Sequence, residues 1–217
     1  MNRRRFIGST AAGLVSAGFA LPKIKAAPIG LQGGNGINIR TLGSTGLKIP
    51  VVSFGVMNSD SPDLLNQALD QGITHLDTAH VYIRGRSEEV IGEVVSKRGA
   101  RDKVIIGTKM RFNSDRETGL FVSEGNSRVP GATEENLREQ LSLSLQRLQT
   151  DYVDILYIHS CNNAAMVNYE PLLNAFVKVK KEGKTRFIGT STHSNEPDVI
   201  RATADAGVFD VVLTAYN

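Results

Sequence analysis

Residues 133–159, TEENLREQLSLSLQRLQTDYVDILYIH, decide the fold class. Four leucines recur at helical spacing along one stripe, namely Leu137, Leu141, Leu145 and Leu148. This spacing predicts a helix over Thr133–Gln149. The apolar run Val153–His159 comes almost directly after it and predicts a buried strand. A helix followed closely by a buried strand is the repeating unit of α/β proteins.

The same alternation continues in both directions along the chain. Short apolar runs predict five further strands, at residues 51–56, 73–78, 104–109, 186–190 and 210–215. Helical patterns predict four more helices, at residues 61–71, 87–98, 170–181 and 196–206, with Ser87 as the N-cap of the second. Strands that alternate with helices favour a parallel sheet built from βαβ units.

The number of predicted elements indicates an incomplete barrel. A closed (β/α)8 barrel needs eight strands and eight helices in about 250 residues. The chain has 217 residues and its patterns give about six strands, so we expect a partial (β/α)8 TIM barrel, a fragment truncated at its C-terminus. A complete six-stranded open sheet is the alternative, although no GxGxxG pattern follows the first strand as a Rossmann domain requires. Two unpaired sheet edges would invite aggregation, so the chain alone is expected to be unstable or inactive.

The first 27 residues differ in composition from the rest. They hold five basic residues and no acidic one, and without those five, 20 basic residues face 22 acidic ones. The basic character of the chain therefore gives no support for nucleic-acid binding. Arg3-Arg4-x-Phe6-Ile7 before a short apolar run predicts a twin-arginine signal peptide over residues 1–27. A disordered basic tail or a retained anchor is the alternative.

A signal of this kind predicts a place in the cell and a partner. We expect the twin-arginine export machinery to carry the folded protein, with any cofactor already bound, to the periplasm or beyond. No stretch reaches the about 20 apolar residues of a membrane-spanning helix. Cys161 is the only cysteine, so an internal disulfide is impossible, and no zinc or iron–sulfur ligand spacing is present.

Four reactive side chains lie at or just past the ends of predicted strands. They are an acid, a phenol, an amine and an imidazole, namely Asp77, Tyr82, Lys109 and His159. The carboxyl ends of barrel strands meet on one face, and that face carries the active site. These residues are therefore expected to form a proton-donating group, in which Tyr82 is the general acid.

From about Arg40 onward the chain resembles the aldo/keto reductase superfamily. The resemblance rests on spaced motifs in the family's order, namely RTLGSTG at 40–46, GITHLDTAHVY at 72–82, GRSEEVIG at 85–92, IIGTK at 105–109 and LSLSLQRLQTDYVDILYIH at 141–159. It implies a hairpin that closes the barrel floor. It also implies a domain layout of a signal peptide (1–27), a linker with the start of the hairpin (28–39) and an incomplete barrel (40–217).

The resemblance also implies an activity, the reduction of an aldehyde or ketone to an alcohol with NADPH or NADH. Lys109 would lower the pKa of Tyr82 by stabilising its phenolate, and Asp77 would keep Lys109 charged. His159 would orient the substrate oxygen. Ser191 and Thr192 would contact the nicotinamide, with Thr192 standing where the family often has asparagine. In many members a glutamine stands at the position of Leu213, and the loops that hold the cofactor phosphates would lie beyond Asn217.

Two other functions stay open at this point. His75 and Asp77 lie two apart on one strand, so with His159 and His193 they could ligate a divalent metal in a barrel hydrolase. A non-catalytic or regulatory barrel fragment is the other alternative. The segment 111–132 is either a lid over the site or a solvated insertion. Cys161 either faces the pocket or packs inertly.

Overall fold

The structure, a computed structural model, describes residues 36–126 and 128–216. The predicted signal peptide and most of the predicted linker lie outside the described residues. The described chain begins with an antiparallel hairpin of β1 (Ile39–Thr41) and β2 (Lys48–Pro50), where the resemblance places one. No helix among these residues is long and apolar enough to cross a bilayer.

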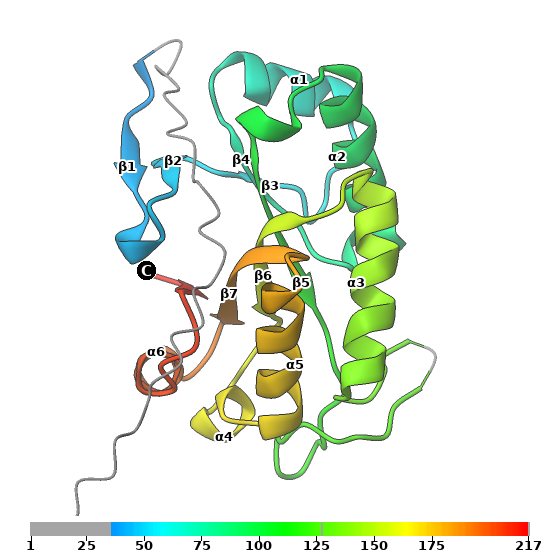
Figure 1. Cartoon of the computed structure of the whole chain (residues 1–217), viewed down its shortest axis with the longest axis vertical. Helices are drawn as coiled ribbons and strands as arrows, with labels where there is room; N and C mark the ends of the chain where they lie inside the picture. Colours follow the sequence, from blue (N-terminus) through cyan, green and yellow to red (C-terminus); the bar gives the residue numbers. More distant parts are fainter. Residues whose placement is uncertain (1–35, 127, 217) are drawn as a thin grey trace, which may run out of the picture.

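Six parallel strands come next in one sheet, in chain order (Figure 1). They are β3 (Phe54–Gly55), β4 (His75–Asp77), β5 (Ile105–Met110), β6 (Val153–Ile158), β7 (Thr185–Thr192) and β8 (Val211–Thr214). This arrangement confirms the expected partial (β/α)8 barrel. Among the described residues β3 and β8 each pair on one side only, as expected for an open sheet. That the chain alone is unstable or inactive stays a prediction.

Helices connect the strands as the sequence predicts. The major ones are α1 (Pro62–Asp70), α2 (Arg86–Lys97), α3 (Glu134–Leu148), α5 (Glu170–Lys181) and α6 (Glu196–Asp205). A short helix that the sequence did not reveal, α4 (Ala164–Val167), begins where the Asn163 side chain accepts a hydrogen bond from the Met166 N–H. The helices and the outer face of the sheet enclose the main apolar core, which includes Ile106, Leu137, Leu156 and Phe176.

The first predicted strand, residues 51–56, is wrong over most of its length. Only Phe54–Gly55 pairs in the sheet, and Val51 and Val52 are 52% exposed. The reason is the hairpin, because the Val51 N–H donates to the Asn38 carbonyl and so extends the β1–β2 pairing. The chain turns into the sheet only after that bond.

The hairpin covers one end of the inner sheet face. It lies on the side of the sheet opposite to helices α2 and α3 (Figure 1). Leu47 from the hairpin is 3% exposed and packs with Ile105, Ile155 and Tyr157, whose side chains point into the barrel. The amino-terminal end of the inner face is therefore closed by apolar contacts.

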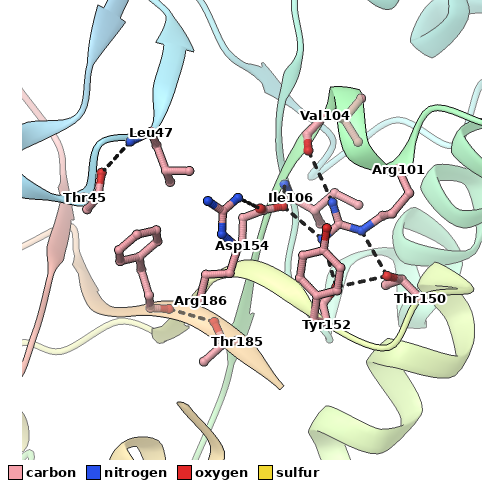
Figure 2. A network of polar contacts seen from close by, with 11 residues as sticks. Thr45, Leu47, Arg101, Val104, Ile106, Thr150, Tyr152, Asp154, Thr185 and Arg186 are labelled. Carbon is pink, nitrogen blue, oxygen red and sulfur yellow. Dashed lines mark hydrogen bonds and ion pairs between the residues drawn. The ribbon is translucent and has the colours of Figure 1, made fainter. Parts of the chain in front are cut away.

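A buried carboxylate joins three strands near their amino-terminal ends (Figure 2). Asp154 of β6 is 1% exposed and accepts a hydrogen bond from the Ile106 N–H of β5 at 3.0 Å. Arg186 of β7 contacts its other oxygen at 2.8 Å, and Arg101 approaches at 3.0 Å. Because each carboxylate oxygen has a charged partner, the desolvation of Asp154 is compensated.

We expect Asp154→Ala to destabilise the protein by about 3–5 kcal/mol, because it strands two mostly buried guanidinium groups. The matched control is Asp70→Ala, which removes an exposed ion pair with Arg98 and should cost less than about 1 kcal/mol. Urea unfolding followed by circular dichroism measures both variants side by side. Equal losses in the two variants would contradict this role for Asp154.

Candidate active site

Sheet register brings three predicted site residues to the same end of the sheet. Asp77 lies opposite Gly107, two residues before Lys109, and Lys109 lies opposite Tyr157, two residues before His159. The His159 N–H donates to the Met110 carbonyl, which continues the ladder past the end of β6. Asp77, Lys109 and His159 therefore lie at the carboxyl ends of adjacent strands, as predicted.

Lys109 is the centre of the group. Its side chain is 2% exposed, and its Nζ donates to Asp77 Oδ2 at 2.6 Å and to the Thr78 carbonyl at 2.7 Å. The same Nζ lies 5.2 Å from the centroid of the Tyr82 ring. Tyr82 meets the His159 ring edge to face, with centroids 5.8 Å apart. The structure thus brings all four predicted residues together.

The expected pKa shift of Tyr82 is wrong. Burial first, and the Asp77 carboxylate second, raise its pKa, whereas the sequence argument expected Lys109 to lower it. The Asp77 carboxylate, 2.6 Å from Lys109 Nζ, opposes the effect of the lysine charge on Tyr82, and burial outweighs what remains. Burial lowers the pKa of Lys109 itself, and Asp77 opposes that shift.

His159 is held neutral. Burial, followed by the charges of Lys109 and Arg111, lowers its pKa to about 3. Its Nδ1 is buried and has no hydrogen-bond partner among the described residues. A neutral imidazole can donate or accept a hydrogen bond, but only a small fraction of it is a proton-carrying cation near pH 7.

The two residues predicted to contact a cofactor lie at the end of β7, and both are 1% exposed. The Ser191 hydroxyl accepts from the Ser160 N–H at 3.0 Å and so fixes the chain just after His159. The Thr192 hydroxyl donates to the Ser194 carbonyl at 2.6 Å. Both therefore shape the rim of the site, and their contact with a nicotinamide stays a prediction.

The metal-site hypothesis gains no support from the geometry. The described residues contain no group of three histidine, cysteine, aspartate or glutamate side chains that could hold a metal ion. His75 instead shares a hydrogen bond with the Ser53 hydroxyl at 2.7 Å, and burial lowers its pKa. His193 is exposed on the rim beyond β7.

Packing bears on two open alternatives of the sequence. In the segment 111–132, Phe112 and Phe121 are buried against each other and Phe121 also meets Tyr169, so this segment is not a merely solvated insertion. Cys161 is fully buried, and burial raises the pKa of its thiol to about 12. Such a thiol is inert packing near neutral pH.

Sequence reasoning missed a buried polar cluster behind Tyr82. Ser87, predicted as the N-cap of α2, lies inside that helix and its hydroxyl donates to the Val56 carbonyl; Gly85 is the N-cap. Glu88, the next residue, is fully buried and contacts Thr108, Ser144 and Arg147. The only sign of this cluster in the sequence was Glu88 of the motif GRSEEVIG, a charged residue at a position that faces the core.

Comparisons with known proteins find relatives over most of this chain. The model of the aldo/keto reductase family matches residues 48–216. The uncharacterized oxidoreductase YqkF of Bacillus subtilis is 34% identical over 168 residues, which are 75% of this chain and 50% of the relative. Versiconal hemiacetal acetate reductase of Aspergillus parasiticus is 33% identical over 70% of this chain and 50% of its own length.

A solved structure shows the same fold. Aldo-keto reductase AKR11C1 from Bacillus halodurans, in its holo form, superimposes with a TM-score of 0.65 at 25% identity. The match covers 83% of this chain and 58% of that one. The chain spans about half the length of the curated relatives it matches.

The shifted pKa of His159 predicts a pH dependence of stability. Its pKa lies at about 3 in the folded protein against 6.5 ordinarily, so between these values the unfolded state binds more protons. Stability should therefore fall as pH drops from about 6.5 toward about 3, and His159→Gln should flatten that fall. Thermal midpoints from circular dichroism between about pH 7 and about pH 4 measure it. Parallel curves for the two proteins would contradict the buried, neutral state of His159.

Proposed function

The chain belongs to the aldo/keto reductase family, and from this premise we propose that it acts in reducing an aldehyde or ketone to an alcohol with hydride from NADPH or NADH. The single observation that carries the proposal is the contact of Tyr82, Lys109, Asp77 and His159 at one pole of the half-barrel. The nicotinamide supplies the hydride, and the protein supplies the proton and the orientation of the carbonyl.

Tyr82 is the general acid in this proposal. Its raised pKa keeps the phenol protonated at neutral pH. His159, whose ring meets that of Tyr82, is the alternative donor, but with a pKa of about 3 only roughly one imidazole in ten thousand carries the extra proton at neutral pH. The phenol therefore donates to the developing alkoxide, and His159 serves as a neutral hydrogen-bonding group that orients the carbonyl oxygen.

Lys109 and Asp77 stabilise the product of that transfer. The phenolate left on Tyr82 would lie near the Lys109 ammonium, whose Nζ is 5.2 Å from the ring centroid. Asp77 offsets the burial that otherwise discharges Lys109. The ion pair is thus suited to stabilise the negative charge that appears on Tyr82 during proton transfer, because preorganised positive charge contributes most at that stage.

The residues at this pole fit the reacting end of a nicotinamide. Asp77 Oδ1 is buried without a partner among the described residues, which is unusual outside a functional site. Ser191 and Thr192 end the neighbouring strand β7, and Tyr216, just past β8, is 95% exposed. We propose that Ser191 and Thr192 contact the carboxamide and that Tyr216 offers its ring face to the flat nicotinamide.

We also propose that residues 1–27 are a twin-arginine signal and that the protein works in the periplasm. The support is the Arg3-Arg4-x-Phe6-Ile7 pattern. Fusion of residues 1–27 to a reporter that is active only after export tests it. Replacing Arg3 and Arg4 by lysine should keep the reporter inside the cell, and an unchanged distribution of the reporter would contradict the proposal.

Removal of the Tyr82 hydroxyl tests the proposed chemistry. We expect Tyr82→Phe to lower kcat for a small aldehyde by about 10²–10⁴-fold, because the proton donor is lost, while NADPH affinity changes little. Loss of NADPH absorbance measures turnover, and NADPH fluorescence measures binding. Tyr169→Phe, which removes a hydroxyl from a ring packed against Phe121, is the matched control. Full activity in Tyr82→Phe would contradict the proposal.

A further inference from the structure

We propose that Arg147 and Glu88 are positioning residues, whose ion pair holds the turn Tyr82–Gly85 so that Tyr82 stays beside Lys109. The inference rests on the proposed function, because it explains how the proton donor is kept in place. Neither residue touches the reacting group. Arg147 comes from α3 and Glu88 from α2, two neighbouring helices of the outer layer (Figure 1).

The turn that carries Tyr82 is strained. Ile83 and Arg84 have φ values of 47° and 56°, and Gly85 comes next at 93°. Left-handed backbone is uncommon for any residue with a side chain and a clear outlier for a β-branched one such as Ile83. Such residues cost conformational free energy and persist only where the surroundings enforce them. Something must therefore hold this turn against its own backbone preference.

Arg147 joins the two ends of the turn. Its Nη1 donates to the His80 carbonyl at 3.1 Å before the turn and to Glu88 Oε2 at 3.3 Å after it. Its guanidinium also lies directly over Gly85, so close that a Cβ at that position would be 2.3 Å from Arg147 Cζ. Gly85 is thus required twice, for its positive φ and for the close approach of the guanidinium.

Glu88 links its ion pair with Arg147 to β5, the strand that carries Lys109. Its Oε1 accepts from the Thr108 hydroxyl at 2.7 Å, and Thr108 directly precedes Lys109 on β5. The His80 N–H donates to the Lys109 carbonyl at 3.1 Å. The turn is therefore anchored through both ends to one short piece of β5, which fixes Tyr82 relative to Lys109.

Burial raises the pKa of Glu88, and the hydrogen bonds from Thr108 and Ser144 and the charge of Arg147 oppose that shift. Glu88 is fully buried, and its carboxylate has a second donor besides Thr108, the Ser144 hydroxyl at 3.0 Å, in addition to Arg147. Burial, followed by the charge of Arg147, lowers the pKa of His80 to about 4. His80 is thus neutral near pH 7 and does not repel the guanidinium.

A purely structural role is the competing explanation, since the same pair also joins α2 to α3. The two roles differ in what they predict for folded protein. Loss of a purely structural pair lowers only the folded fraction, whereas loss of a pair that holds the turn also lowers turnover per folded molecule. Misplacement of a reacting group by about 1 Å can cost about 10²-fold in rate.

The test compares Arg147→Lys and Glu88→Gln in the whole protein. Lysine keeps the charge but cannot reach two partners as the guanidinium does, and glutamine keeps the shape of Glu88 without its charge. We expect kcat for a small aldehyde to fall about 10–10²-fold, with KM and NADPH affinity within about threefold. Hydrogen–deuterium exchange should be at least about tenfold faster in residues 80–86 than in the unmodified protein, but unchanged in β5.

Arg138→Lys is the matched control, because Arg138 lies on the same helix α3 and pairs with Glu182 at the exposed surface, away from the turn. Unchanged kcat per folded molecule in both test variants would overturn the proposal, and so would unchanged exchange in residues 80–86. Faster exchange without loss of kcat would also overturn it. If the unmodified protein is inactive, as expected for a chain with two open sheet edges, the exchange data alone decide whether Arg147 and Glu88 hold the turn.

Discussion

The structure depends on the register of three adjacent strands, and one buried carboxylate fixes it. Asp154 on β6 takes a backbone N–H from β5 and a guanidinium from β7, so a shift of either neighbour would leave a charge buried without a partner. A slip by one residue would also turn every side chain of a strand to the opposite face. The strand register that places Lys109 and His159 at adjacent strand ends is therefore fixed at the opposite end of the sheet.

The two ends of the sheet treat their buried charges differently. At the amino-terminal end, both oxygens of Asp154 have charged partners, as a stabilising site requires. At the carboxyl end, Asp77 Oδ1 and His159 Nδ1 are buried without partners among the described residues. Unsatisfied buried polar atoms cost about 1–3 kcal/mol each, and functional sites are where proteins retain them. Thr74, His75 and Gln140 also carry buried polar atoms without partners among the described residues, so this feature supports the proposed site only together with the contact of the four side chains.

Periodicity in the sequence predicted the central strands, but it failed where tertiary contacts decide. The apolar runs located β5 and β6 within about two residues, and their ends therefore located Lys109 and His159. The same kind of pattern overextended the strand at residues 51–56, because pairing with the hairpin competes for Val51. Ser87 matched the sign of an N-cap but is buried, with its hydroxyl bonded to the Val56 carbonyl, and the neighbouring Glu88 is buried against α3.

The direction of the Tyr82 pKa shift could not be predicted for a similar reason. From the sequence alone, the positive charge of Lys109 is expected to lower the pKa of Tyr82. In the structure Lys109 is paired with Asp77, and burial dominates the pKa of Tyr82. The result still suits a proton donor, because a protonated phenol at neutral pH is the form that can give a proton away. In the proposed reaction Lys109 offsets part of the cost that burial and Asp77 place on the phenolate, but too little to lower the pKa of the phenol. Placement matters more than resting acidity in such a site, and a strained turn under a buried ion pair is one way to secure placement.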